Sequence, residues 1–260
     1  MIKREEIIQA LDKIFSKPLL QKAAVKDDLP NGIQIKGNPS VHTVALGVSC
    51  SDRFISEAVK SDAQMVICHH GLYTGGDIYK GRFDVIESRL KTIIKHDITL
   101  AGYHYCLDAH SKIGNNVQLI NLLGASQTGE AYFDEWGYVG EYKVPITHEE
   151  LKNRLEKVVK HEVFTVSSGP ELIKRIGVCS GSAKPRAKEL FEIIDHQIDA
   201  HITGEISESG PHSAEAVGFT YFACGHYATE TFGIKALGQE LTKIFKNDLA
   251  IKFIDVPASI

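Results

Sequence analysis

The sequence lacks several features that mark particular classes of protein. Its 260 residues include one Trp, two Met and five cysteines, and no two cysteines are spaced as a C-x-x-C pair. Scattered cysteines of this kind are typical of buried thiols in a reducing compartment, and they argue against a disulfide scaffold or a structural zinc site. No run of about 18 apolar residues is present, and the first residues become acidic without a leader-like apolar stretch. We therefore expect a soluble, cytoplasmic protein that does not bind membranes.

The sequence also lacks an excess of positive charge. It has 29 Lys and Arg against 33 Asp and Glu, which gives a formal net charge of -4. Without a global basic field, nucleic acid is a disfavoured partner. A local basic patch around Lys80, Arg82, Arg89 and Lys91 keeps that alternative open. Histidine, in contrast, is abundant: its 12 residues supply metal ligands and proton carriers at neutral pH.

Segments with strand-like and helix-like apolar periodicity alternate along the chain, as they do in proteins with a parallel sheet. Predicted strands cover 33–35, 43–48, 64–68, 98–102, 162–166, 173–179, 200–203, 220–223 and 250–254. Predicted helices cover 3–15, 53–60, 83–95, 115–123, 147–159, 184–194, 212–217 and 229–245. The stretch 124–142 interrupts this alternation, which then restarts.

The repeated pattern predicts an α/β protein with two similar α/β lobes, whose mixed, largely parallel sheets are covered by helices. The first lobe is expected at 1–125 and can include the C-terminal segment, and the second is expected at 126–260. Ligand sites favour the carboxyl ends of parallel strands and the junctions of domains. The expected site therefore lies between the two lobes.

Three predicted strands run directly into histidine. His69 and His70 follow the strand at 64–68, His104 follows 98–102, and His226 follows 220–223. A carboxylate comes four residues after two of them, Asp108 after His104 and Glu230 after His226. Because the carboxyl ends of parallel strands form one edge of a sheet, these side chains are expected to meet.

The residue types in these clusters suit a metal centre. Neutral imidazole and carboxylate bind Zn, Mn, Fe, Ni or Co, and a carboxylate four residues after a histidine can reach the same ion across a helical turn. Six such groups exceed the four ligands of one zinc, so two ions about 3.5 to 4 Å apart fit better. A lone histidine at a strand end is more often structural, but three clusters with the same placement favour the metal interpretation.

The other histidines are divided by their surroundings. Five fall in turns or on solvated helix faces and are interpreted as structural: His42, His96, His148, His161 and His196. Three stand near the clusters and stay undecided: His110, His201 and His212.

Three further polar segments have alternative interpretations. Glu205, after the strand at 200–203, is an acceptor that orients an imidazole, a catalytic carboxylate or a helix cap. The glycine-rich loop 71–81, with Tyr73, Tyr79 and Lys80, is a substrate lid or a surface turn. The turn 179–182 can hold a phosphate, although strand-to-helix turns are often rich in Gly and Ser without doing so.

Five motifs, taken in order, resemble the family of GTP cyclohydrolase I type 2 homologues, also called the Ngg-interacting-factor-three-like family. They are Pro30–Ile35, Val66–Gly71, His104–Asn116, Thr203–Glu208 and Gly225–Glu230. The chain is similar to the short bacterial branch, which has no inserted third domain. The sequence departs from many relatives at Gly71, where they have Pro, and at 209–211, where some have paired histidines.

The resemblance implies a two-lobed fold with a dinuclear metal centre that faces the interior of a toroidal homohexamer, a trimer of dimers. It also implies two divalent ions per subunit, with Asp108 as the bridge and His104 as a further ligand or a proton-transfer residue. The implied metal ligands are His69, His70, Asp108, His226 and Glu230.

We therefore interpret the chain as a metal-dependent hydrolase that acts on a small, nucleotide-like substrate, with His104 or Glu205 moving protons. In a purine ring opening, a metal-bound hydroxide would attack C8, and a nearby imidazole would protonate the ring nitrogen that leaves. The alternative is a hexameric metal-binding adaptor or metal-trafficking protein without turnover, which needs the same ligands. An open coordination position beside loop 71–81 would favour the enzyme, and a saturated metal shell would favour the adaptor.

Overall fold

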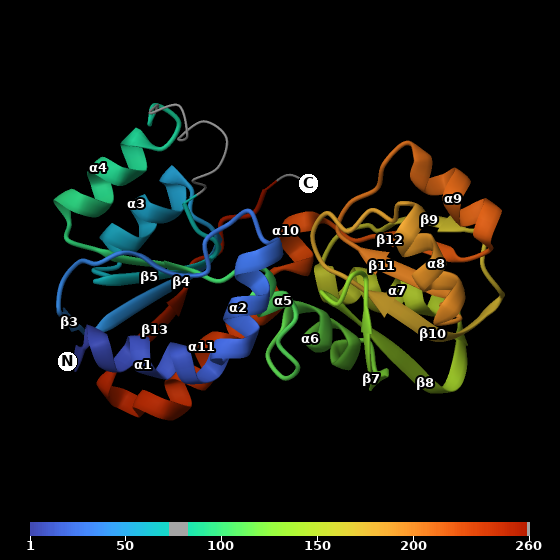
Figure 1. Cartoon of the computed structure of the whole chain (residues 1–260), viewed down its shortest axis with the longest axis horizontal. Helices are drawn as coiled ribbons and strands as arrows, with labels where there is room; N and C mark the ends of the chain where they lie inside the picture. The colour runs from blue at the N-terminus through green and yellow to red at the C-terminus, as the bar shows by residue number, and fades with distance from the viewer. Residues whose placement is uncertain (73–82, 259–260) are drawn as a thin grey trace. The chain divides into compact units, whose positions relative to one another are not determined.

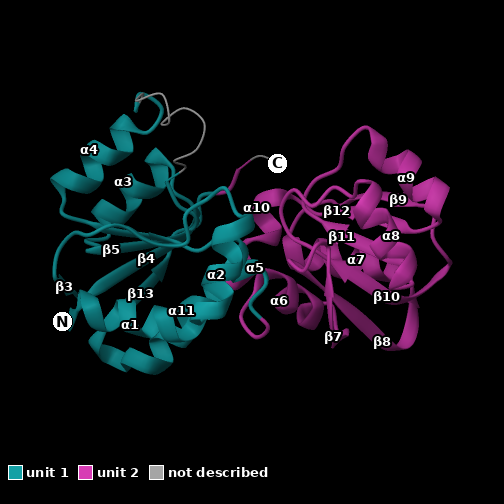
Figure 2. Ribbon diagram, viewed as in Figure 1, with its two compact units in different colours: residues 1–110, 234–256 teal, residues 111–233, 257–260 magenta. Residues whose placement is uncertain are grey.

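The chain folds into two compact units, as a computed structural model that describes residues 1–72 and 83–258 shows. Unit 1 comprises Met1–His110 and Ile234–Val256, and unit 2 comprises Ser111–Gly233 with the residues from Pro257 onward (Figure 2). The division at residue 125 expected from the sequence differs from this one. The helix after residue 114 packs on strands of unit 2, and the last strand pairs within unit 1.

Unit 1 contains a five-stranded sheet in the order β13-β4-β5-β6-β2. Its strands are β2 (Gly32–Ile35), β4 (Thr43–Ser49), β5 (Met65–His70), β6 (Thr99–Gly102) and β13 (Ala250–Phe253). The four strands β13, β4, β5 and β6 run parallel, and β2 adds an antiparallel edge. A separate two-stranded ladder joins β1 (Ile2–Lys3) to β3 (Ser40–Val41). The parallel core therefore carries the carboxyl ends of β4, β5 and β6 to one edge.

Helices cover both faces of the unit 1 sheet. Its helices are α1 (Arg4–Phe15), α2 (Lys17–Lys26), α3 (Asp52–Lys60), α4 (Glu87–Lys95), α5 (Tyr105–Asp108) and most of α11 (Thr231–Phe245). In Figure 1, α3 and α4 lie on one face, and α1 and α11 lie on the other. Ser51 caps α3 by accepting the Phe54 amide at 3.2 Å, and Phe54, Ile55 and Ala58 form its buried stripe.

Unit 2 contains a six-stranded sheet in the order β7-β8-β10-β11-β12-β9. The strands are β7 (Ser126–Tyr132), β8 (Gly137–Thr147), β9 (Phe164–Ser167), β10 (Leu172–Val178), β11 (Ala200–Thr203) and β12 (Thr220–Ala223). Only β10, β11 and β12 run parallel, because the hairpin β7–β8 and the edge strand β9 are antiparallel. The expectation of largely parallel sheets thus fits unit 1, whereas unit 2 is mixed and the interruption at 124–142 falls largely on a hairpin.

Two apolar cores hold the helices of unit 2 against its sheet. These helices are α6 (Asn115–Leu122), α7 (His148–Val159), α8 (Ala187–Asp195), α9 (Ser209–Val217) and α10 (His226–Thr229). One core joins Leu119 and Leu151 of α6 and α7 to the sheet, and the other joins Ile193 and Ala214 of α8 and α9 to it. The helix predicted at 229–245 is interrupted at Glu230, between α10 and α11. Within the described residues, every helix is too short or too polar to cross a membrane.

Candidate metal centre

Unit 1 gathers four of the predicted site residues at the carboxyl end of β5 and in the segment that follows β6. The ring centroids of His69, His70 and His104 lie 4.7 to 5.1 Å from one another. Each ring offers a nitrogen, and the three nitrogens lie within 4.8 Å of one another. Nε2 of the fully buried His69 is 3.6 Å from a carboxylate oxygen of Asp108, at the end of α5. These four residues, called the unit 1 cluster, can supply three imidazoles and a carboxylate to a metal.

The fold holds Nδ1 of each of these imidazoles. Nδ1 of His69 lies 3.0 Å from the carbonyl oxygen of Tyr103, and Nδ1 of His70 lies 3.0 Å from the hydroxyl of Ser49. Ser49 is placed there because it pairs with His70 in the parallel ladder of β4 and β5. Engagement of Nδ1 by the protein sets the ring orientation and makes Nε2 the nitrogen that a metal would use.

The third imidazole, His104, is held by Asp27, which follows the end of α2. The Nδ1 atom of His104 lies 2.8 Å from Oδ1 of Asp27, whose side chain is only 1% exposed. The Asp27 carboxylate also accepts hydrogen bonds from the amides of Leu29 and Tyr105 and from the side chain of Asn31. Burial alone would raise the pKa of Asp27, but these hydrogen bonds and the His104 charge lower it below its usual value. From the sequence, Asp27 has the pattern of a turn former only, so its role was missed.

Unit 2 gathers the remaining predicted site residues around His226, at the start of α10. Nδ1 of His226 lies 2.6 Å from an oxygen of Glu205, and its Nε2 lies 3.1 Å from an oxygen of the buried Glu230. Glu205 also forms an ion pair with Lys184. The unit 2 cluster of His226, Glu230 and Glu205 thus repeats the arrangement of unit 1, with Nδ1 held by the protein and Nε2 beside a carboxylate.

Charge in the unit 2 cluster favours a protonated imidazole when no metal is bound. Burial by itself lowers the pKa of His226, but Glu230 and then Glu205 outweigh it and raise that pKa to about 9. Hydrogen bonds from Lys184 and His226 lower the pKa of Glu205, so this carboxylate is ionised at neutral pH. A divalent cation at Nε2 would take the place of the proton beside Glu230, while Nδ1 would keep its proton toward Glu205.

The structure gives the undecided histidines structural partners. Buried His201 accepts from the Tyr132 hydroxyl at Nδ1 and donates through Nε2 to the Ala183 carbonyl, both at 2.9 Å. Nε2 of His110 is 3.0 Å from the carbonyl oxygen of Ile14. His212 is largely exposed, 3.8 Å from Glu208.

The turn at 179–182 uses its amides within the fold. The Ser180 amide donates to Asn116 at 2.7 Å, and the Gly181 amide donates to Thr229 at 3.0 Å. These donors stabilise the packing of the turn and do not point to a phosphate site.

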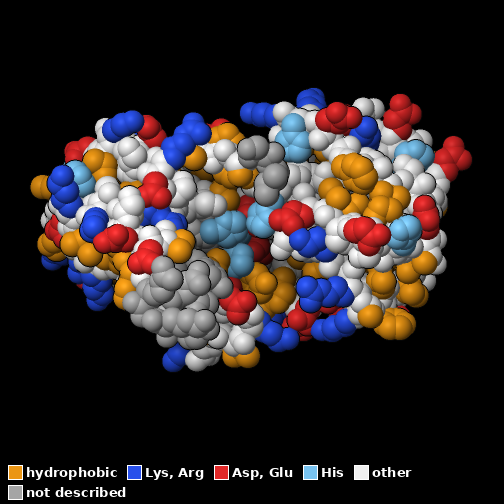
Figure 3. All heavy atoms as spheres, turned by 90° about the horizontal axis from the view of Figure 1, so that it is seen from above, with side chains coloured by type: hydrophobic (Ala, Val, Ile, Leu, Met, Phe, Trp, Pro, Cys, Tyr) orange, Lys and Arg blue, Asp and Glu red, His pale blue; other side chains and the backbone are white. Residues whose placement is uncertain are grey.

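Most of the predicted lid, 71–81, and part of the predicted basic patch lie outside the described residues, which omit 73–82 with Tyr73, Tyr79, Lys80 and Arg82. In the described part, Arg89 donates to the carbonyls of Cys50 and Val85, and Lys91 pairs with Glu87 at 2.7 Å. Figure 3 shows basic and acidic side chains interspersed over the visible face.

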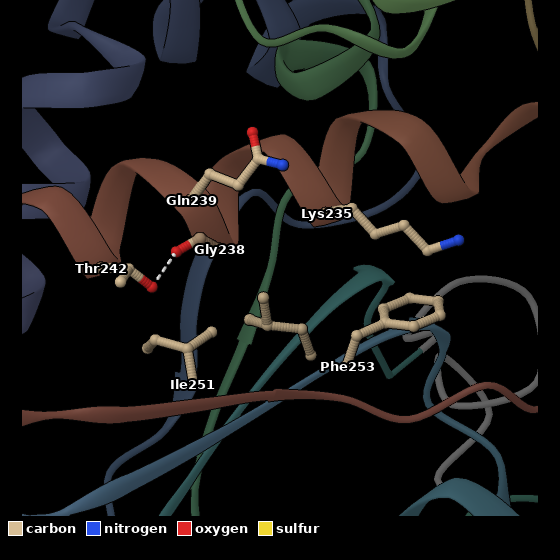
Figure 4. Close-up of a pocket in the computed structure, with 7 residues that line it drawn as sticks. Lys235, Gly238, Gln239, Thr242, Ile251 and Phe253 are labelled. Atoms are coloured by element: carbon tan, nitrogen blue, oxygen red, sulfur yellow. Dashed lines mark hydrogen bonds between the residues drawn. The ribbon is translucent and has the colours of Figure 1, made fainter.

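A pocket of about 310 Å³ opens in unit 1 between α11 and β13 (Figure 4). Its walls are mainly apolar, with Leu46, Ile251 and Phe253, and the Lys235 ammonium lies 4.5 Å from the centre of the Phe253 ring. None of its lining residues is a histidine, aspartate or glutamate. The pocket therefore does not mark the metal site.

Comparison with known proteins places the chain in a family. The family model for Duf34/NIF3 (NGG1p interacting factor 3) matches residues 2–259. A protein of Escherichia coli (strain K12) named GTP cyclohydrolase 1 type 2 homolog is 38% identical over 244 residues, which cover 92% of this chain and 94% of that protein. The solved structure of protein ybgI, of unknown function, has a TM-score of 0.85 and 34% identity, and TTHA1606 from Thermus thermophilus has 0.84 and 26%, each covering both chains completely. The chain therefore belongs to the Duf34/NIF3 family.

Proposed function

We propose that this protein is a metal-dependent hydrolase in which the unit 1 and unit 2 clusters together hold two divalent ions. The observation that carries the proposal is that the protein holds four histidines by the same ring nitrogen. In His69, His70, His104 and His226, the protein engages Nδ1. Two of them also have Nε2 next to a buried carboxylate. His201, in contrast, has both nitrogens bonded to uncharged groups, the Tyr132 hydroxyl and the Ala183 carbonyl, and no carboxylate among these partners.

The donor set fits a catalytic metal better than a thiolate site. His69, His70 and Asp108 from unit 1 and His226 and Glu230 from unit 2 would hold the ions, with Asp108 as the bridge. Burial raises the pKa of Cys68 and Cys106 well above its usual value, so both stay thiols beside the unit 1 cluster. Nitrogen and oxygen ligands of this kind suit Zn, Fe, Mn, Ni or Co.

Two imidazoles are held at Nδ1 by a carboxylate, His104 by Asp27 and His226 by Glu205, and the two have separate roles in this proposal. Bound divalent ions would lower the pKa of a coordinated water and polarise the substrate. His104, held by Asp27, would act through Nε2 as a further ligand, or would accept or return a proton there. Glu205 would hold His226 through Nδ1 and keep its Nε2 directed at the metal, so it orients a ligand and does not itself touch substrate.

The substrate class rests on the relatives. Relatives that are 35–38% identical carry the name GTP cyclohydrolase 1 type 2 homolog. We therefore propose a small, nucleotide-like substrate, and we propose the homohexamer implied by the family resemblance as the assembled form.

The decisive test measures metal and turnover on the same preparation. The purified full-length protein should contain about two tightly bound divalent ions per chain, the number that a dinuclear site requires. A panel of purine nucleotides and cyclic amides should then show hydrolysis that a chelator abolishes and added metal restores. Fewer than one tightly bound ion per chain would refute the metal centre. Two bound ions without turnover of any panel member would favour the non-catalytic adaptor or metal-trafficking role.

A glycine beside the unit 2 cluster provides a second test. Gly181 has a φ of +68°, and a Cβ there would lie 2.3 Å from an oxygen of Glu230. Gly181→Ala should displace this carboxylate, a proposed ligand, and lower zinc affinity by at least the roughly 10- to 100-fold that loss of an outer partner of a ligand costs. Isothermal titration with Zn²⁺ would measure the change.

Gly218→Ala is the matched control for this variant. Gly218 also has a positive φ, +85°, but a Cβ there would meet nothing within 4 Å. Both substitutions therefore carry a similar backbone cost of about 1–2 kcal/mol. Equal zinc affinities in the two variants would show that Glu230 is not a ligand.

A further inference from the structure

Asp27 forms a buried network with the loop that carries His104. We propose that Asp27 is a positioning residue of the metal centre, which fixes His104 in the Nδ1–H tautomer and so directs its Nε2 at His69 and His70. The inference rests on the proposed function, because it gives His104 a role at the metals. It concerns a residue far from the cluster in sequence, 77 positions before His104.

The Asp27 carboxylate has a saturated set of partners that are all donors. Oδ1 lies 2.9 Å from the Leu29 amide and 2.8 Å from Nδ1 of His104. Oδ2 lies 2.8 Å from Nδ2 of Asn31 and 3.0 Å from the Tyr105 amide. Three of these groups can only donate, and together they favour the ionised carboxylate. His104 can therefore satisfy Oδ1 only by carrying its proton on Nδ1.

Asn31 holds the backbone of the same loop, so its role is distinct from that of Asp27, which holds the His104 ring. Its side-chain oxygen accepts the His104 amide at 2.8 Å and the Cys106 thiol at 3.0 Å. Its Nδ2 donates to Asp27 and to the Leu29 carbonyl, so the orientation of its amide is set by four partners. Asn31 thus fixes where the loop lies, and Asp27 fixes the tautomer and rotation of the His104 ring.

An amide at position 27 should reverse the tautomer. In Asp27→Asn, an NH₂ group replaces either Oδ1 or Oδ2 of the carboxylate, and at each position it meets groups that now donate to that oxygen. At Oδ2 it would face the Tyr105 amide, which can only donate, and Nδ2 of Asn31. Asn31 could present its oxygen there only by flipping its amide and losing its bonds to His104, Cys106 and Leu29. At Oδ1 it would face the Leu29 amide and His104, and the imidazole can accept by moving its proton to Nε2. The variant therefore favours the Nε2–H tautomer, which blocks that nitrogen for a metal or a proton.

The test observes the tautomer directly in the full-length protein. Long-range ¹H–¹⁵N NMR of histidine-labelled, metal-free protein, with His104 assigned by comparison with His104→Gln, should show Nδ1 protonated in the wild type. In Asp27→Asn the proton should move to Nε2, and Zn²⁺ affinity should fall by about 10- to 100-fold. Asp62→Asn is the matched control, because Asp62 lies 3.3 Å from His42 in an exposed pair of the same unit. It should leave both readouts unchanged.

A double-mutant cycle separates positioning from support of the loop. In the His104→Gln background, Asp27→Asn should cause no further loss of Zn²⁺ affinity, because the imidazole through which it acts is absent. An equal loss in both backgrounds, or an Nε2–H tautomer in the wild type, would overturn the inference. The wild-type spectrum tests the predicted tautomer of His104 even if Asp27→Asn fails to fold. The tautomer is measured without metal, whereas metal content tests the proposed function, so the two can fail separately.

Discussion

Replacing Asp108 with alanine should reduce the metal content of the protein from about two ions per chain to less than one. In the proposed dinuclear centre Asp108 serves both ions, so its removal should weaken the binding of both. His69→Ala should remove the ion nearest to it, because His69 is completely buried and its Nε2 lies 3.6 Å from Asp108. In either variant the affinity for Zn²⁺ should fall by more than the roughly 10- to 100-fold that loss of a ligand's hydrogen-bond partner costs. Elemental analysis after reloading with Zn²⁺ measures both effects.

A control variant in unit 1 and a ligand variant in unit 2 complete this experiment. His96→Ala changes an exposed histidine at the end of α4 in the same unit and should leave the metal content unchanged. Glu230→Ala in unit 2 should also reduce it, since the proposal assigns ligands to both clusters. Metal content that is unchanged in Asp108→Ala and His69→Ala would contradict the assignment. Loss in unit 1 variants but not in Glu230→Ala would restrict the centre to unit 1.

Acid should destabilise the protein through His201, which is buried in unit 2. Burial lowers the pKa of His201 from 6.5 to about 4. Between these values the unfolded chain binds a proton that the folded protein does not, so stability falls as the pH falls from 6.5 to 4 and this loss is complete below 4. The lost free energy of unfolding is about 3 kcal/mol, at 1.36 kcal/mol per pKa unit.

Urea denaturation across this pH range would measure the effect. His201→Gln keeps a donor for the Ala183 carbonyl and an acceptor for the Tyr132 hydroxyl but does not titrate. The variant should be less stable than the wild type near pH 8, and the gap should narrow by about 3 kcal/mol at pH 4. His212→Gln, at a side chain that is 74% exposed, is the matched control with a constant gap. A constant gap for His201→Gln as well would refute the pKa assignment.

Much of the unit 1 fold could be predicted from apolar patterning. The strands β4, β5 and β6 are buried on both faces, so each appears in the sequence as a short apolar run. The hairpin β7–β8 was missed because β7 exposes most of its side chains and includes Gly129 and several polar residues. Its pairing depends on backbone hydrogen bonds to β8, which leave no apolar signal in a single strand.

The partners of the histidines could not be predicted in the same way. Ser49 meets His70 only through the register of two strands, and Asp27 meets His104 only because the end of α2 lies beside α5. His201 is the second residue of β11, close in sequence to Glu205, and the fold gives both of its nitrogens partners within unit 2. The sequence shows which residue types are present and how they are spaced locally. These contacts, however, join positions that are 18 to 77 residues apart.

The sequence by itself determined that histidines and carboxylates lie at or just after the carboxyl ends of parallel strands, because apolar runs locate the strands and the chain order gives the residues that come next. It also determined the chemistry of the donors, since no cysteine pair accompanies them. Only the tertiary structure decided which nitrogen of each imidazole the protein holds, and that Asp27 and Glu205 are the carboxylates that hold two of them. The physical reason is that a tautomer depends on a hydrogen bond across space, which local sequence patterns do not specify.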